Sequence, residues 1–131
     1  MRLVVDASVV VQACIEAAGL GPLEGHELVA PPLMRAEALS AIHELLYRGA
    51  ITVDLAGIAR RRLAEFGYTV AEPPGLVMST WEIADQLGWA KTYDAEYVAV
   101  AKLLSIPLVT IDGRLQRGAG RVAQVLGVAD L

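Results

Sequence analysis

Four acidic residues, far apart in the chain, occupy positions where their carboxylates could act together. Asp6 and Asp112 each follow a short apolar run, at the point where a buried strand would end. Asp94 stands where an apolar helical segment begins, and Glu37 stands in the first turns of another. A hydrophobic core has no use for such charges, because a buried carboxylate is costly unless it is paired. A shared function therefore explains these residues better than packing does.

The order of the surrounding segments predicts where these carboxylates meet. Short apolar runs alternate with helical segments, which is typical of α/β proteins with a mainly parallel sheet. Such sheets bind their ligands beyond the carboxyl ends of the strands. Asp6 and Asp112 each close a strand at that edge. The helix that begins at Asp94 runs back along the sheet, and the helix of Glu37 follows a strand, so both helix starts are expected at the same edge.

Carboxylates that converge in this way repel one another, and the repulsion points to a cation. Two carboxylates about 4 Å apart repel by roughly 4 kcal/mol at an effective dielectric of about 20. Raised pKa values or a bound cation must offset that energy. Oxygen ligands without Cys or His favour Mg²⁺ or Mn²⁺ over zinc. Because such an ion orients a phosphodiester and helps to activate water, the residues indicate metal-assisted phosphodiester hydrolysis.

Each acidic residue also has an ordinary structural interpretation when it is considered alone. An Asp at a strand end often caps the next helix, and for Asp6 and Asp94 this interpretation is as good as the functional one. Glu37 alone fits a solvated helix flank, and Asp112 before Gly113 fits a simple turn. Only the joint arrangement favours a shared site.

The other residues with chemical potential are assigned structural roles. We expect Arg60–Arg62 on a solvated helix face, and His26 and His43 on the surface. Trp81 and Trp89 are expected to be core or interface anchors, because indole rings bury much apolar area.

The composition is that of one globular domain over residues 1–131. The chain has 131 residues, 55% of them apolar, and a mean hydropathy of +0.48, which excludes a disordered chain. No apolar run reaches the ~18 residues of a membrane span, and no signal peptide is expected. Cys14 is the single cysteine and is assigned to packing, so no disulfide within the chain is expected. These features predict a cytoplasmic protein.

Charge and apolar content also bear on partners. A net charge of −4 is atypical of a static nucleic-acid binder, but it suits an enzyme that holds cations in an acidic site. An apolar content of 55% exceeds what one small core hides, which predicts a homodimer. The region around Trp81 and the helices of the first half are the expected contact.

The remaining elements follow from turn and periodicity signals. Strands are expected at residues 3–5, 28–30, 68–70, 108–111 and 122–126. Helices are expected after a cap at Ser8, from Pro31 to about Arg48, from Thr52 to Phe66, from Leu76 to Leu87 and from Asp94 to Leu104. Ala17 is expected on the apolar face of the first helix, and between Asp112 and the last strand only a turn at Gly118 and Gly120 is expected.

Four stretches of the sequence together resemble the PIN-domain ribonucleases, and within them the VapC-type toxins of bacterial and archaeal toxin–antitoxin pairs. The stretches are VVDASVVV near the N-terminus, the Pro-Pro-x-x-x-x-Glu start of the second helix, LGWAKTYDAEYVAVAKLLSIPLVTIDGRL, and the final VLGVADL. They span nearly the whole chain and keep the family's order. The resemblance implies a PIN-like three-layer α/β fold, with a central, mainly parallel sheet flanked by helices.

The resemblance also implies roles for the acidic residues. The family uses an acidic quartet around Mg²⁺ or Mn²⁺ to cut RNA, and its members match Asp6, Glu37, Asp94 and Asp112 here. Asp6 and Asp94 match the positions that the family uses for metal, so Glu37 and Asp112 would complete the pocket.

Neighbouring positions match as well. Ser8 and Thr110 match polar positions beside the site. Basic residues on the family's third helix pair often face the substrate, and Arg60–Arg62 would correspond, although no motif fixes this.

These observations predict a Mg²⁺-dependent endoribonuclease, the toxin of a type II toxin–antitoxin system, with RNA as substrate and a cognate antitoxin as partner. One alternative is a phosphoaspartate-type phosphatase or receiver domain. It is disfavoured because Asp6-Ala7-Ser8 carries no second acid and Lys102 falls inside a predicted helix. The other alternative is a non-catalytic PIN-like interaction protein. Retention of the whole acidic quartet disfavours it.

Overall fold

A five-stranded parallel sheet forms the centre of the molecule, in the strand order β3-β2-β1-β4-β5. The computed structural model describes residues 1–16, 19 and 21–131. Within these ranges the strands are β1 (Arg2–Val5), β2 (Glu27–Ala30), β3 (Thr69–Val70), β4 (Leu108–Val109) and β5 (Val125–Leu126). In the register of the sheet, Leu3 of β1 lies beside Leu28 of β2, and Val5 lies beside Val109 of β4. The three inner strands are apolar on both faces, as a sheet covered on both sides requires.

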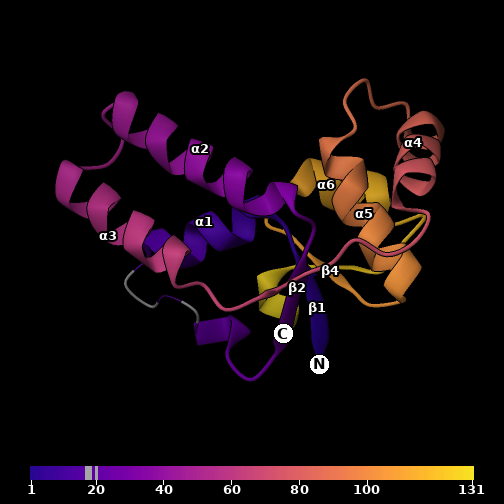
Figure 1. Ribbon diagram of the computed structural model, residues 1–131, viewed down its shortest axis with the longest axis horizontal. Helices are drawn as coiled ribbons and strands as arrows, with labels where there is room; N and C mark the ends of the chain where they lie inside the picture. The colour runs from indigo at the N-terminus through magenta and orange to yellow at the C-terminus, as the bar shows by residue number, and fades with distance from the viewer. Residues whose placement is uncertain (17–18, 20) are drawn as a thin grey trace.

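Helices cover the two faces of this sheet, so the predicted three-layer α/β fold is confirmed (Figure 1). On one side α1, α2 and α3 pack against one another, and on the other α5 packs against α4 and contacts β1 and β4. The helices are α1 (Ala7–Ile15), α2 (Leu33–Tyr47), α3 (Val53–Ala64), α4 (Leu76–Leu87), α5 (Tyr93–Leu104) and α6 (Gly113–Ala119). Short 3₁₀ turns occupy Gly21–Leu23 and Val128–Asp130. None of the described helices is long and apolar enough to cross a membrane.

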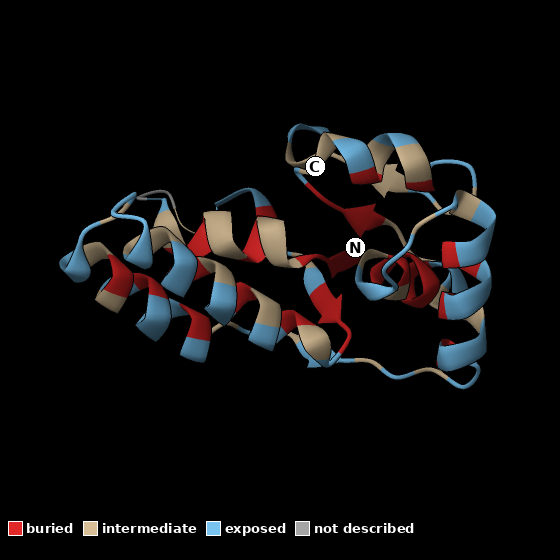
Figure 2. Ribbon diagram, turned by 90° about the horizontal axis from the view of Figure 1, so that it is seen from above, coloured by how far each residue is buried: buried red, intermediate tan, exposed pale blue. Residues whose placement is uncertain are grey.

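Buried residues concentrate in the strands and in the inward faces of the helices (Figure 2). Tyr97, Leu3 and Met34 are the largest fully enclosed side chains. Around Tyr97, α5 is buried over most of its circumference, because it lies between the sheet and α4. The chemistry that α5 carries must therefore sit at its first turn, where it emerges from the core.

Local backbone signals explain where several helices begin and end. Thr52 caps α3 by accepting a hydrogen bond from the N–H of Leu55 at 3.1 Å. Gly88 ends α4 in the left-handed conformation, with φ of 72°. Ser105 ends α5 in the same conformation, with φ of 56°, just before Pro107 prevents further helix.

The expected helix cap at Ser8 was wrong. Asp6 is the cap of α1, and its Oδ1 accepts the N–H of Val9 at 3.1 Å. The extended backbone of Asp6 fits an N-cap, whereas Ser8 already lies in the first turn. Ala17 lies outside the described residues.

The segment after Asp112 also differs from the prediction. Asp112 caps a short helix, α6, in a region where only a turn at Gly118 was expected. The glycines of this segment hide the helix from sequence reasoning, because glycine has a low intrinsic helix propensity. The last strand is shorter than the predicted 122–126, since only Val125 and Leu126 pair with β4.

Candidate metal and active site

The four acidic side chains named from the sequence lie at the starts of four helices, on the carboxyl edge of the sheet. Asp6 immediately precedes α1 and Asp112 immediately precedes α6. Asp94 is the second residue of α5, and Glu37 lies in the second turn of α2. Their charges interact: Asp94 raises the pKa of Asp6 and of Glu37, and Asp112 raises the pKa of Asp94. The structure therefore gathers all four into one electrostatic neighbourhood.

Asp6 is the most enclosed of these carboxylates, with only 5% of its surface exposed. Its Oδ1 accepts hydrogen bonds from Ser8 Oγ at 2.6 Å and from the N–H of Val9, and its Oδ2 accepts one from Thr110 Oγ1. Burial is the main cause that raises its pKa; these hydrogen bonds lower it, and the charge of Asp94 raises it further. Asp6 thus serves as a helix cap and as a member of the acidic group at once.

Thr110 connects two of the acidic residues. Its fully buried hydroxyl donates to Asp6 and accepts a hydrogen bond from the N–H of Asp112 at 3.0 Å. Gln116 of α6 donates to the backbone carbonyl of Thr110 at 3.3 Å. This chain of contacts fixes the end of β4, and with it Asp112, relative to the end of β1.

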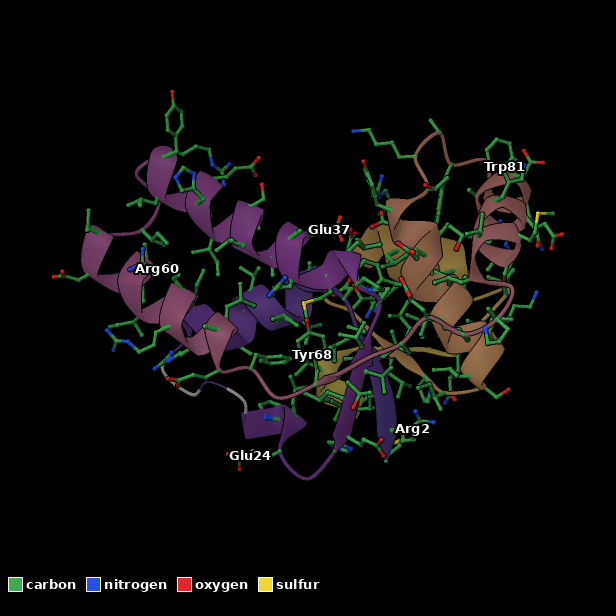
Figure 3. All side chains as sticks on the ribbon, in the orientation of Figure 1. Arg2, Glu24, Glu37, Arg60, Tyr68 and Trp81 are labelled. Atoms are coloured by element: carbon green, nitrogen blue, oxygen red, sulfur yellow. The ribbon has the colours of Figure 1, made fainter. Side chains whose placement is uncertain are left out.

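Glu37 is held by a residue that sequence reasoning missed. Tyr97 donates from its hydroxyl to Glu37 Oε1 at 2.6 Å, and the rest of its side chain is buried in the core. Figure 3 places Glu37 on α2 near the end closest to α5. Burial raises the pKa of Glu37, the bond from Tyr97 lowers it, and the charges of Asp94 and Asp6 raise it. Burial, followed by Glu37, raises the pKa of the Tyr97 hydroxyl, which therefore stays protonated and remains a donor.

Asp94 is paired with a cation from α6. Arg114 Nη2 lies 2.7 Å from Asp94 Oδ2, on the solvent side of the group. Burial raises the pKa of Asp94, the Arg114 charge lowers it, and Asp112 raises it. Asp112 in turn accepts the backbone N–H groups of Arg114 and Leu115 with its Oδ1, at 2.9 and 3.3 Å, as the cap of α6.

The donor set suits a hard divalent cation. Among the described residues, no hydrogen-bond donor reaches Oε2 of Glu37, Oδ1 of Asp94 or Oδ2 of Asp112, so each keeps an oxygen available. In the conformations described, however, no three Asp, Glu, His or Cys side chains enclose a metal site.

Sequence reasoning missed three residues of this neighbourhood, and each carries a weak signal. Tyr97 follows Asp94 by three positions on a helix, which places the two on one face. Glu96 follows Asp94 by two positions, and the charge of Glu37 raises its pKa after burial does. Arg114 follows Asp112 by two positions, which puts it in the first turn of a helix that was not predicted.

The arginine run of α3 has a partly structural use. Arg62 Nη1 donates to the carbonyls of Cys14 and Glu16, at 3.0 and 2.9 Å, and so closes the C-terminal end of α1. A cation at that end also complements the helix dipole. All three arginines, Arg60–Arg62, are exposed, as expected.

A parallel sheet between layers of helices, with acidic side chains at its carboxyl edge, fits the PIN class of nuclease. Comparison with known proteins narrows this class to a family. No family model matches the chain. The chain is similar to VapC ribonuclease Mb0985 of Mycobacterium bovis and to ribonuclease VapC9 of Mycobacterium tuberculosis, with 38% identity to each over 117 residues. The aligned region covers 86% of this chain and 87% of each relative. The chain therefore belongs to the VapC family of ribonucleases, and its predicted assignment to the nucleases is confirmed.

Solved structures show the same fold. PAE2754 of Pyrobaculum aerophilum superposes with a TM-score of 0.77 at 26% identity, covering 99% of this chain and 91% of that one. VapBC-1 of Haemophilus influenzae superposes with a TM-score of 0.66 at 14% identity, covering 98% and 99%. FitAcB of Neisseria gonorrhoeae superposes with a TM-score of 0.64 at 16% identity, again covering 98% and 99%. At these last two identities the likeness concerns the fold alone.

Proposed function

We propose that this VapC-family ribonuclease is a metal-dependent endoribonuclease in which Asp6 and Asp94 bind Mg²⁺ or Mn²⁺. One observation carries the proposal: four carboxylates from distant parts of the chain stand at one edge of the sheet, where Thr110 is hydrogen-bonded to both Asp6 and Asp112. A divalent cation would relieve the repulsion between these carboxylates. A bound ion would supply Lewis acidity for the phosphodiester and a more acidic water.

The residues of the chain have distinct tasks in this proposal. Ser8 and Thr110 fix the rotamer of Asp6, and Tyr97 fixes that of Glu37. Glu37 would accept a hydrogen bond from the attacking water, and its raised pKa brings it closer to the range in which a general base works well. Asp112 would hold a second water, or a second ion, beside Asp94.

In vitro cleavage of total RNA tests this proposal, with sequencing of the newly formed ends. We expect cleavage with Mg²⁺ and none in a chelator. Asp6→Asn or Asp94→Asn should abolish it while the fold survives, since each change removes a ligand charge and keeps the side-chain shape. Asp85→Asn, on the exposed face of α4, is the matched control. Full activity of Asp94→Asn at limiting Mg²⁺ would overturn the metal assignment.

We further propose that the chain is a cytoplasmic toxin and that a cognate antitoxin silences it. Family membership supports a paired partner, and the structure offers two features for one. A groove of about 160 Å³ lies between α2 and α3, with Leu39, Leu46 and Val53 among its apolar lining. The acidic edge would attract a cationic side chain from a partner, as Arg114 already shows by pairing with Asp94.

A homodimer is also part of the proposed function. Val77, Met78 and Trp81 project from α4 with 82, 63 and 65% of their surfaces exposed. Figure 3 shows Trp81 at the periphery of the molecule, on α4. Three large apolar side chains on one helix face are the kind of patch that marks an interface, and two-fold dimers are the commonest solution.

A further inference from the structure

A hollow of about 480 Å³ opens beside the acidic residues and contains groups that the proposed chemistry does not use. Its walls are Glu37 of α2, the loop from Gly88 to Lys91, the first residues of α5 and Arg114 of α6. The volume lies within the range of about 300–1,000 Å³ that is typical of sites for small ligands. Glu37 and Asp94 belong both to the lining of this hollow and to the acidic quartet. A polymer bound in the hollow would therefore pass directly beside the acidic residues.

Cations stand on the rim of this hollow. Arg114 has a side chain that is 70% exposed, and one of its five N–H donors is recorded on Asp94. It can therefore keep Asp94 and still donate to another anion. Lys91 is exposed on the α4–α5 loop, which lines the same hollow. The chain carries a net charge of −4, so two cationic side chains beside an acidic site run against its overall charge. Their local positive charge favours the binding of a polyanion.

The hollow also contains an exposed aromatic side chain. Tyr93 lines the hollow with 58% of its surface exposed, immediately before Asp94. An exposed ring in a hollow with cations fits an unpaired nucleotide, because bases stack on aromatic faces while cations follow the phosphates. Double-stranded RNA would not offer its base faces in this way. The groups therefore favour a single strand.

The loop that carries Lys91 is anchored rather than loose. The indole of Trp89 rests on Gly118 of α6, where an added Cβ would lie 2.9 Å from the ring. This contact ties the α4–α5 loop, which carries Lys91, to α6, which carries Arg114. The glycine is required there by close approach and not by its backbone angle.

The other basic surface of the chain is less suited to substrate. Arg62 is engaged with the end of α1, and Arg60 lines the apolar groove between α2 and α3. In Figure 3, Arg60 lies toward the far end of the α2–α3 pair, well away from Glu37.

We propose that the hollow between the α4–α5 loop and α6 binds single-stranded RNA beside the scissile phosphate, with Arg114 and Lys91 on phosphates and Tyr93 stacked on a base. This inference rests on the proposed function, because the RNA is that of the same site. It replaces Arg60–Arg62 with Lys91, Tyr93 and Arg114 as the substrate surface.

Fluorescence anisotropy with a labelled, unstructured RNA oligonucleotide tests the proposal. All proteins would carry Asp6→Asn, so that the RNA stays intact in Mg²⁺ and binding is measured apart from cleavage. We expect Lys91→Ala and Arg114→Ala each to weaken binding several-fold and to reduce the slope of log K against log salt by about 0.7. Tyr93→Ala should weaken binding about tenfold with little change in slope, and Tyr93→Phe should retain it.

Arg60→Ala and Arg61→Ala are the matched controls, with thermal unfolding of every variant to confirm its fold. If these two variants weaken binding and the Lys91 and Arg114 variants do not, the proposed RNA-binding surface is wrong. The proposed ribonuclease function is not affected by that result. Equal binding by Tyr93→Ala, or a duplex of the same sequence bound as tightly as the single strand, would also overturn it. Cleavage of the oligonucleotide by the Asp6→Asn protein would instead contradict the proposed metal site, and binding by the variants would then be compared in a chelator.

Discussion

Burial raises the pKa of Asp6, yet the same side chain caps α1 and joins the ends of β1 and β4 through Thr110. The two interpretations that the sequence leaves open for this residue are therefore compatible. A cap that must also be ionised in a crowded acidic group stabilises the fold less than an ordinary cap. The stability that Asp6 contributes should therefore depend on pH and on bound cations.

The first prediction concerns this sensitivity. Asp6, Glu37 and Asp94 have pKa values raised above 3.8, 4.5 and 3.8 respectively, mainly by burial. A group with a raised folded-state pKa contributes stability that is fully present below its unfolded pKa and is lost as pH rises through the folded value. The contribution of these three groups to the melting temperature of the metal-free protein should therefore fall as pH rises from below 3.8 toward neutrality.

Calorimetry of the metal-free protein checks this, with Asp6→Asn as the comparison. At pH 7 the variant should unfold at or above the wild-type temperature, and the difference should shrink in acid. Mg²⁺ at about 100 times its Kd should stabilise the wild type by about 2.7 kcal/mol and the variant far less. Equal stabilisation of both proteins by Mg²⁺ would place the ion elsewhere.

The second prediction concerns Tyr97. The hydrogen bond from the Tyr97 hydroxyl lowers the pKa of the Glu37 carboxyl. Replacement of Tyr97 with Phe removes the hydroxyl and this bond. The pKa of Glu37 should then rise further, so the acidic limb of the cleavage pH profile should move to higher pH. Loss of the bond should also cost about 1 kcal/mol of unfolding free energy. A pH profile that does not move, with the stability loss present, would reduce Tyr97 to a packing role.

At the scale of elements, Asp6, Asp94 and Asp112 stand at helix starts on one edge of the sheet, and Glu37 lies one turn into α2. Helix starts offer free N–H groups and positive potential, so carboxylates collect there for local reasons. Asp112 illustrates this, since its Oδ1 accepts two N–H groups in the first turn of α6, while no hydrogen-bond donor among the described residues reaches its Oδ2.

The third prediction separates these two tasks of Asp112. Asn caps helices about as well as Asp, whereas Ala does not. Asp112→Asn should keep the stability of the wild type within about 0.5 kcal/mol and still lose most cleavage, because only the charge is removed. Asp112→Ala should lose cleavage and, in addition, about 1 kcal/mol of unfolding free energy. Denaturant unfolding and a cleavage assay distinguish the variants, and an active Asp112→Asn would leave Asp112 with the cap alone.

The whole molecule leaves two apolar surfaces on opposite sides of the sheet: the α4 face and the groove between α2 and α3. Two separate surfaces allow two partners to bind at once. We assign the first to a second copy of the chain and the second to the antitoxin.

The fourth prediction is a homodimer through the α4 face. Light scattering at micromolar concentration should give twice the monomer mass of 13.9 kDa. Trp81→Glu should dissociate the dimer, because it buries a charge without a partner at the centre of the patch. Tyr47→Glu, at another exposed aromatic on α2, is the control and should stay dimeric. A monomeric wild type would contradict the dimer, and a dimeric Trp81→Glu would move the interface elsewhere.

The fifth prediction concerns the antitoxin. Expression of this chain alone should arrest growth in a suitable host, and co-expression of the neighbouring reading frame should restore it. Rescue should require the groove, so Leu46→Glu should weaken it while cleavage in vitro persists, because Leu46 lies on the groove and not at the acidic edge. A chain that cuts RNA yet is harmless when expressed alone would be a housekeeping processing enzyme instead.

The sequence by itself determined the α/β class and the parallel sheet and singled out the four acidic residues, because each rests on local pattern: apolar runs, turn signals and carboxylates at element ends. The start and end of α4 at Leu76 and Leu87 were predicted to the residue, since Gly88 and the proline pair before the helix are strong signals. Only the tertiary structure decided what holds those acids in place. Tyr97 on Glu37, Arg114 on Asp94 and Thr110 on Asp6 are contacts between residues 20 to 104 positions apart in sequence. No local propensity encodes them, because they exist only once the sheet has brought the helix starts to one edge.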